Sequence, residues 1–129
     1  MRLLIDTDLL LWAVAEPQRL PGSTRERLES ADNDVLFSAV SIWELAIKIQ
    51  IGRLNLPVSP EEIARAAASM GFEELPVTSS HAAAVMRLPL HHRDPFDRLL
   101  VAQAIQEPAR FLTVDRLLGR YSEVVEVLA

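Results

Sequence analysis

The chain has 129 residues, of which 50% are hydrophobic, and its formal net charge is −5 at pH 7. That length suits one compact domain with a sizeable core, which we place over residues 1–129. The acidic charge argues against a broad basic surface for nucleic acid, the absence of cysteine excludes disulfides and thiolate chemistry, and no apolar run reaches the roughly 20 residues of a membrane span.

The N-terminal segment, MRLLIDTD, holds an apolar run that is too short for a secretory signal, so we expect a cytoplasmic protein. The residues Leu3–Ile5 predict a first strand, which ends at Asp6. Apolar residues resume after Thr7 and Asp8, so Asp6 lies between two segments that should be buried. A buried carboxylate is costly unless it is protonated, paired with a cation or bound to a metal.

The second predicted strand is Val35–Phe37, and a helical pattern follows it. The apolar face of this helix consists of Ile42, Leu45, Ala46 and Ile49. Ser41 and Glu44 have the Ser-x-x-Glu spacing of a capping box, so capping is one interpretation of Glu44. Lys48, the only lysine of the chain, comes four residues after Glu44, where an ion pair on the helix surface is expected.

The middle of the chain predicts one helix and one strand. Ser59, Pro60 and Glu62 supply an N-cap, a first-turn proline and a capping-box glutamate to an alanine-rich helix. The segment Glu73–Val77 then has strand character. We expect His81, which follows two serines, to lie at the surface.

The last third of the chain holds a second acidic group. Pro95–Gln106 predicts a helix with an apolar face, with Asp94 as its N-cap and Asp97 in its first turn. Two further strands are predicted after it: Phe111–Val114 and Val124–Leu128. Asp115 comes directly after the first of these strands, and capping of the next turn is a sufficient explanation of its position.

Strands that alternate with helices predict a parallel sheet with helices on both faces, so we expect a three-layer α/β/α sandwich around a small parallel sheet. Such sheets bind ligands beyond the carboxyl ends of their strands. Asp6 and Asp115 follow predicted strands, while Glu44 and Asp97 lie near the starts of helices. All four carboxylates are therefore expected at one edge of the sheet.

Four converging carboxylates repel one another unless a cation lies among them. Oxygen ligands without cysteine suit Mg²⁺ or Mn²⁺. One or two such ions bind a phosphodiester, lower the pKa of a water molecule and stabilise the leaving oxygen. The acidic set therefore predicts metal-assisted phosphodiester hydrolysis, while helix capping stays an alternative for Glu44, Asp94 and Asp115 taken singly.

Four segments in this order, LLIDTDLLLWA, SIWELAIK, HHRDPFDRLLVAQA and FLTVDRLLGRY, resemble those of PIN-domain ribonucleases of the VapC toxin type. The resemblance runs from residue 2 to about residue 121. It implies a small parallel α/β/α sandwich and an endoribonuclease that depends on Mg²⁺ or Mn²⁺, with one or two ions per site. It also implies RNA as the substrate, a cognate antitoxin that inserts a segment into the cleft, and a homodimer.

The resemblance extends to single residues. The positions that match the acidic site of the family are Asp6, Glu44, Asp97 and Asp115. Of these, Asp6 and Asp97 resemble the central metal ligands, and Asp115 is expected as a further ligand. Both Glu44 and Asp115 resemble supporting ligands or groups that orient the water. Two hydroxyl residues resemble groups that support the carboxylates: Thr7 and Thr113. Asp8 stands where relatives often carry histidine, and we expect it to stabilise a helix start.

Arginines beside the acidic positions are the candidates for contacts with RNA phosphates: Arg93, Arg98, Arg116 and Arg120. His91 and His92 either touch RNA or lie in an exposed polar loop. Three aromatic residues either stack on a base or belong to the core or a dimer interface: Trp12, Trp43 and Phe96.

Other classes of protein share parts of this pattern. The segment LLIDTDLL resembles the start of haloacid-dehalogenase-type phosphohydrolases, in which the first aspartate is a nucleophile. That chemistry relies on a later lysine, and the only lysine here, Lys48, lies within a helical pattern. A PIN-type domain that binds RNA or protein without cutting it is a further alternative.

Overall fold

The computed structural model describes residues 1–91 and 93–128, and its described strands form one parallel sheet. The strands are β1 (Arg2–Ile5), β2 (Asp34–Ser38), β3 (Glu73–Leu75), β4 (Arg110–Thr113) and β5 (Val125–Val127). Their spatial order is β3-β2-β1-β4-β5, and each neighbouring pair is parallel. Each strand overlaps a segment that the sequence predicts, so the prediction of a parallel sheet is confirmed.

Six α-helices lie between the strands in the described part of the chain. They are α1 (Thr7–Ala15), α2 (Thr24–Glu29), α3 (Ala39–Gln50), α4 (Pro60–Ser69), α5 (Ser79–Ala84) and α6 (Pro95–Gln106). Short 3₁₀ turns follow at η1 (Pro17–Arg19), η2 (Val85–Arg87) and η3 (Arg116–Arg120). The sequence predicts α3, α4 and α6, but it does not predict α2 or α5.

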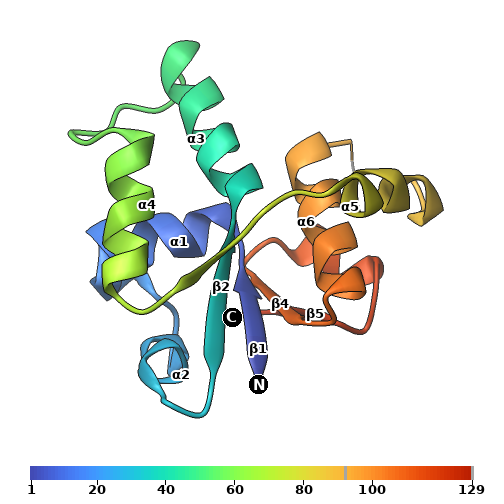
Figure 1. Ribbon diagram of the computed structural model, residues 1–129, viewed down its shortest axis with the longest axis horizontal. Helices are drawn as coiled ribbons and strands as arrows, with labels where there is room; N and C mark the ends of the chain where they lie inside the picture. The colour runs from blue at the N-terminus through green and yellow to red at the C-terminus, as the bar shows by residue number, and fades with distance from the viewer. Residues whose placement is uncertain (92, 129) are drawn as a thin grey trace.

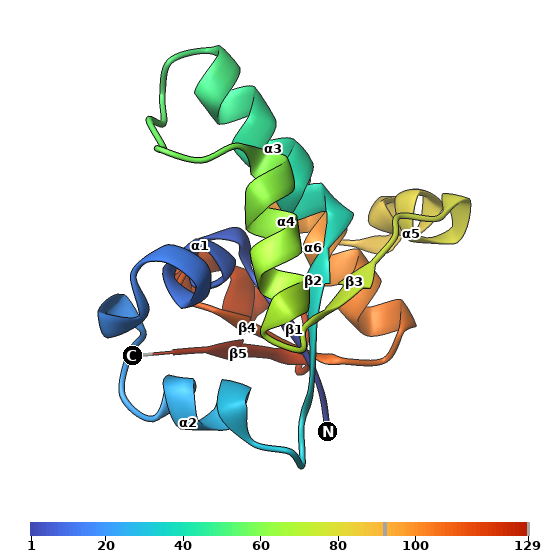
Figure 2. The same cartoon turned by 60° about the vertical axis from the view of Figure 1, so that its left-hand side comes forward.

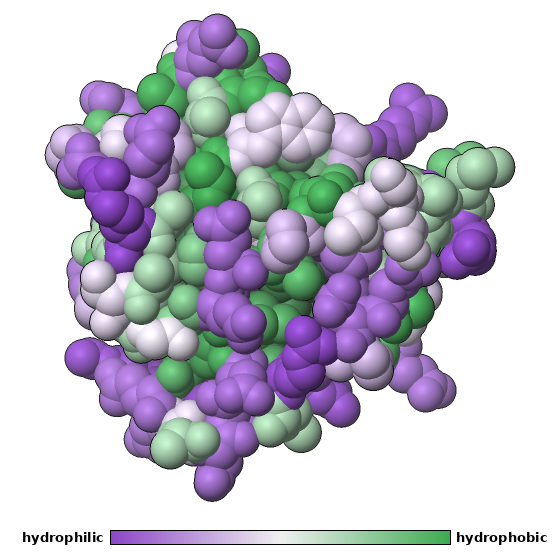
Figure 3. Space-filling model, in the orientation of Figure 1, coloured by the Kyte–Doolittle hydropathy of each residue, from purple (hydrophilic) through white to green (hydrophobic). Residues whose placement is uncertain are grey.

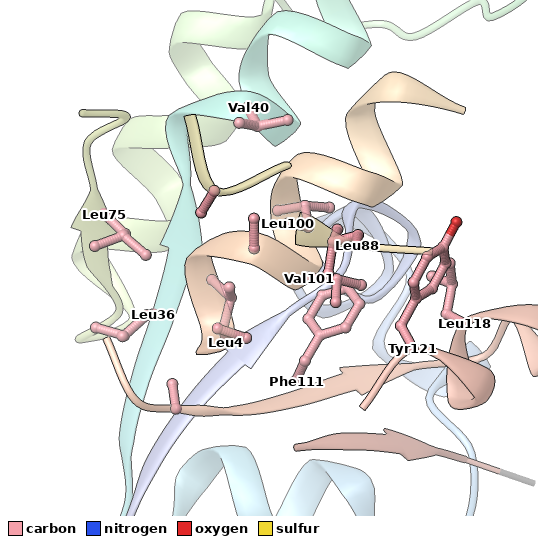
Figure 4. Close-up of a cluster of buried hydrophobic side chains, with 14 residues drawn as sticks. Leu4, Leu36, Val40, Leu75, Leu88, Leu100, Val101, Phe111, Leu118 and Tyr121 are labelled. Carbon is pink, nitrogen blue, oxygen red and sulfur yellow. The ribbon is translucent and has the colours of Figure 1, made fainter. Parts of the chain in front are cut away.

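Helices cover both faces of the sheet, as Figures 1 and 2 show, with α1 and α4 on one side and α5 and α6 on the other. Successive residues of β1 point to opposite faces, so Leu3 and Ile5 join one buried cluster and Leu4 joins the other. The second cluster contains Phe111 and Val101, which Figure 4 shows packed between the sheet and α6. The predicted three-layer sandwich is confirmed.

The start of α3 corrects one interpretation of the sequence. The helix begins at Ala39, and Ser38 is its N-cap, with a hydroxyl that accepts a hydrogen bond from the Val40 N–H at 3.0 Å. Ser41 and Glu44 therefore lie inside the helix, where both are buried. The capping-box interpretation of this pair is wrong, because the end of β2 and not the Ser-x-x-Glu motif sets the first turn.

Two other predicted caps are confirmed. Ser59 and Glu62 form a capping box at the start of α4, with the Glu62 N–H donating to the Ser59 hydroxyl at 3.2 Å. The Asp94 side chain caps α6 and accepts from the Phe96 N–H at 2.9 Å and from the Asp97 N–H at 3.3 Å. Asp94 therefore fixes the first turn that carries Asp97.

His81 is a second correction, because it is 3% exposed and not on the surface. Its Nδ1 accepts from the Thr78 N–H at 3.1 Å, and its Nε2 lies 2.7 Å from the Glu107 carboxylate. An Nδ1 that accepts leaves the ring proton on Nε2, which donates to Glu107. The imidazole thus caps α5 and ties it to the end of α6.

The described helices are short. The two longest, α3 and α6, have 12 residues each. Within the described ranges, the search for a helix with the length and apolar character needed to cross a membrane finds none.

Candidate active site

The predicted acidic residues come together at the carboxyl edge of the sheet. A cavity of about 70 Å³ at this edge is lined by Asp6, Thr7, Asp8, Glu44, Lys48, Asp97, Thr113 and Asp115. Parallel strands β1 and β4 place two of these carboxylates side by side, and the first turns of α3 and α6 open at the same edge. The set therefore contains all four predicted acids and both predicted hydroxyl residues.

Asp6 is buried and held by three hydrogen bonds. Its Oδ1 accepts from the Leu9 N–H at 2.8 Å, which makes it the N-cap of α1. Its Oδ2 accepts from the Thr113 hydroxyl at 2.7 Å and from the Val114 N–H at 3.2 Å. Burial outweighs these donors, so the pKa of Asp6 is raised to about 6.

Glu44 is also buried, and each of its oxygens has a donor. The Thr7 hydroxyl donates to Oε1 at 2.6 Å, and the Lys48 ammonium donates to Oε2 at 2.6 Å. The Ser41 hydroxyl lies 2.9 Å from that of Thr7. A hydroxyl has one proton, so Thr7 gives its proton to Glu44 and accepts from Ser41. Thr7 therefore supports Glu44, whereas Thr113 supports Asp6.

Lys48 brings a positive charge into the site. Partial burial opposes that charge, but the hydrogen bond and the charge of Glu44 outweigh burial, so the Lys48 pKa lies above its ordinary value. The carboxylates of Asp8 and Asp94 act in the same direction. The expected ion pair with Glu44 is present, although it lies at a cavity wall and not on an open helix surface.

Asp97 has the most perturbed acidity of the site. Burial raises its pKa, and the charges of four neighbouring carboxylates add to that effect, so the pKa reaches about 8. In order of size, these neighbours are Asp94, Glu44, Asp115 and Asp6. A proton or another cation is therefore bound favourably among these groups at neutral pH.

Asp115 begins the 3₁₀ turn η3. Its Oδ1 accepts from the Leu117 N–H at 3.0 Å, and its own N–H donates to the Thr113 hydroxyl at 3.1 Å. Thr113 therefore links Asp115 to Asp6 through one hydroxyl. The capping alternative for Asp115 is confirmed, and Asp6, for which the sequence did not suggest a cap, also caps a helix; each does so while it lines the cavity.

The donor chemistry of this cavity fits a hard divalent cation, since its acidic ligands are all carboxylate oxygens. In the part of the chain that the structure describes, no group of three or more histidine or acidic side chains has the geometry of a finished metal site. Asp8 lies in the first turn of α1, is exposed and lines the cavity, so its helix-start position also places it at the mouth of the site.

The arginine candidates divide into two groups. Three of them are exposed: Arg93, Arg116 and Arg120. Arg98 is instead buried, and its guanidinium donates to the carbonyl oxygens of Pro89 at 2.9 Å and Val85 at 3.2 Å. Those bonds hold the η2 segment against α6, so the placement of Arg98 corrects its selection as a phosphate contact.

The remaining candidates that the structure describes do not line the cavity. Trp43 is 54% exposed and meets Phe96 edge to face, with ring centroids 4.9 Å apart, so Trp43 is not a core residue. Trp12 packs against a buried cluster, under the guanidinium of Arg19. His91 is exposed beside Tyr121, and His92 lies outside the described residues.

Sequence reasoning missed the role of two side chains at this site. Ser41 donates to Thr7, and Lys48 lines the cavity. The sequence does hold a signal for Lys48. Glu44 is next to Leu45 of the apolar face, which places Glu44 near the buried side of the helix, and Lys48 lies four residues after Glu44.

Comparisons with known proteins agree with this architecture. The PIN domain family matches residues 3–124. Ribonuclease VapC22 of Mycobacterium tuberculosis is 33% identical over 120 residues, which cover 89% of this chain and 88% of that protein.

Solved structures with the same fold include VapBC2 from Rickettsia felis bound to a DNA fragment from its promoter. A chain of that structure has a TM-score of 0.73 and 16% identity, with full coverage of both chains. FitAcB from Neisseria gonorrhoeae has a TM-score of 0.60 and 20% identity, with 98% of this chain and 96% of that chain covered. At these identities the two likenesses show the fold.

Proposed function

Since the chain belongs to the PIN-domain family, we propose that it is a divalent-metal-dependent endoribonuclease and the toxin of a toxin–antitoxin pair. The observation that carries this proposal is the cavity in which Asp6, Glu44, Asp97 and Asp115 meet at the carboxyl edge of the sheet. The similarity of the chain to a protein named as a ribonuclease supports RNA as the substrate.

The residues of the cavity have different proposed roles. Asp6, Asp97 and Asp115 would hold one or two Mg²⁺ or Mn²⁺ ions, and binding would draw these carboxylates together. The bound cation supplies a water of lowered pKa and a positive charge beside the phosphate. Thr113 orients Asp6 through its 2.7 Å hydrogen bond, and Thr7 orients Glu44. Glu44 lies where a carboxylate can orient the attacking water.

Contacts with RNA away from the reacting phosphate would come from exposed arginines. Arg93 precedes α6 and its Asp97, whereas Arg116 and Arg120 lie in η3, directly after Asp115. With a net charge of −5, few phosphates are contacted, and a shallow dependence of RNA binding on salt is expected.

A cognate antitoxin and a second copy of the chain are the proposed protein partners. The solved structures that share this fold include two toxin–antitoxin complexes, VapBC2 and FitAB. Large apolar side chains are exposed on this chain, including Met86 at 90% and Leu90 at 89%. Figure 3 shows hydrophobic side chains among hydrophilic ones on one face, and such apolar surface is what an antitoxin or a second copy would cover.

The phosphohydrolase alternative loses support from the family match, since the PIN domain family covers residues 3–124. It also needs a lysine for its chemistry, and the only lysine of the chain, Lys48, lies within α3 and pairs with Glu44. The binding-only alternative predicts a metal-loaded protein that cuts no RNA, and it is tested by the same experiment.

The test incubates the purified protein, without a partner, with total cellular RNA and Mn²⁺ or Mg²⁺, and maps the cut ends by sequencing. Asp6→Asn is the key variant, because asparagine also caps helices well and keeps α1 intact. Asp32→Asn, at an exposed turn, is the matched control. Cuts that require metal, persist in Asp32→Asn and vanish in Asp6→Asn are expected. Equal cutting by wild type and Asp6→Asn would refute the proposal.

A further inference from the structure

Lys48 is the one cation among the residues that line the acidic cavity, and its contacts set it apart from a surface lysine. Its partner Glu44 has a side chain that is 5% exposed, whereas the Lys48 side chain is 41% exposed. The ammonium therefore lies at the boundary between the buried carboxylate and solvent. It is also the only lysine in a chain that otherwise uses arginine.

The ion pair with Lys48 makes Glu44 a weaker metal ligand than Asp6, whose three hydrogen-bond donors are uncharged. Thr7 and Lys48 each bond one oxygen of Glu44 at 2.6 Å. A cation already sits against this carboxylate, so a metal ion among Asp6, Asp97 and Asp115 would be repelled by Lys48 while it gains little from Glu44. Lys48 therefore offsets part of the negative charge that Glu44 adds to the cavity.

The ammonium has further donors for a ligand. It carries three N–H groups, and Glu44 Oε2 accepts one of them. The side chain is partly open to solvent and lines the same cavity as Asp97 and Asp115. A phosphodiester that enters this cavity meets Lys48 as the cation of its protein wall.

We propose that Lys48 is a phosphate-binding residue of this site, fixed by Glu44, and that it competes electrostatically with the metal. This inference rests on the proposed ribonuclease function. It assigns Glu44 a positioning role that acts through Lys48, in place of direct metal ligation. It predicts that loss of the ammonium has opposite effects on two quantities, metal affinity and cleavage.

The experiment measures both quantities in Lys48→Met. Titration of Mn²⁺ into the RNA-free protein by calorimetry should give a Kd that is lower by about fivefold, because a like charge has left the cavity. The single-turnover cleavage rate at saturating Mn²⁺ should fall by about tenfold or more, because the phosphate has lost a charged donor. Lys48→Arg keeps the charge, so its Kd for Mn²⁺ should match that of the wild type.

Arg53→Met is the matched control, since it removes one positive charge from an exposed residue just beyond the same helix. It should change neither the Kd nor the cleavage rate by more than about twofold. Thermal unfolding of each variant without metal checks that the fold is kept. If Lys48→Met is unfolded, Lys48→Gln serves as the test, because it keeps an N–H donor for Glu44 without the charge and should show the same lower Kd and lower cleavage rate.

Two results would overturn the inference while leaving the proposed function intact. Weaker Mn²⁺ binding together with slower cleavage in Lys48→Met would show that Lys48 only holds Glu44 as a ligand. Values equal to those of Arg53→Met would show an ordinary surface ion pair. A wild-type protein that neither binds Mn²⁺ nor cuts RNA would instead refute the proposed function, and the inference with it.

Discussion

Replacement of Thr113 by valine isolates the hydrogen bond that orients Asp6. Valine has the shape of threonine and the same preference for strands, so β4 and its packing are kept. The substitution removes the 2.7 Å bond from the Thr113 hydroxyl to Asp6 Oδ2. It also removes the acceptor of the Asp115 N–H, which lies 3.1 Å from the same hydroxyl.

The size of the effect depends on the charge of Asp6. Its pKa is about 6, so the group is mostly ionised at pH 8 and mostly protonated at pH 5. A hydrogen bond to a charged group contributes about 1.5–3 kcal/mol, and one to a neutral group about 1 kcal/mol. We therefore expect Thr113→Val to lower the free energy of unfolding by about 2–3 kcal/mol at pH 8 and by about 1 kcal/mol at pH 5.

Urea unfolding of the metal-free protein at both pH values measures this difference. Thr113→Ser is the control, because it keeps the hydroxyl and loses a buried methyl group, which costs about 1 kcal/mol at either pH. A loss in Thr113→Val that is equal at pH 5 and pH 8, or larger at pH 5, would refute the assignment of this hydroxyl to an ionised Asp6.

Three further predictions concern charge and packing. The pKa of Asp97 is raised to about 8, so between about pH 4 and pH 8 the native state binds a proton that the unfolded state has released. The free energy of unfolding in urea should therefore fall as pH rises through this range, and Asp97→Asn should flatten that slope. Removal of metal by EDTA should lower the Tm more at pH 8.5 than at pH 6, because the cation replaces that proton, and an equal effect at both would count against Asp97 as a ligand. Arg98→Ala should cost about 2–3 kcal/mol in urea unfolding, because the carbonyls of Val85 and Pro89 lose a charged donor and the core loses a buried side chain. Exposed Arg116→Ala should stay within about 0.5 kcal/mol and weaken RNA binding instead.

The features that sequence predicts here are those fixed by local pattern. The five strands follow from apolar runs, and α4 and α6 follow from the caps at Ser59 and Asp94, which satisfy backbone donors within three residues. The convergence of Asp6 and Asp115 follows from a general rule of parallel sheets, since each acid comes directly after a strand.

The features that sequence misses depend on partners far along the chain. His81 is buried because Gln103 and Glu107, more than twenty residues later, reach its ring. Arg98 turns inward because the carbonyl oxygens of the η2 segment lie under it. Glu44 has the spacing of a capping box, yet α3 is capped by Ser38, the last residue of β2. The Ser38 hydroxyl also donates to Gln103 of α6, which lies far along the chain. None of these partners is visible in a local window.

Capping and function are not alternatives at this site, because the caps make it possible to bury its acids. Asp6 and Asp115 each accept a backbone N–H from the turn that they begin, which offsets part of the cost of holding a carboxylate away from water. The cap of α6 is Asp94, so Asp97 lies three positions further along the chain and instead gains a carboxylate neighbour. That difference explains why Asp97 has the higher pKa of the two acids that resemble central ligands. It also makes Asp97 the carboxylate that gains most from a bound cation, and hence the one whose proton a metal must displace.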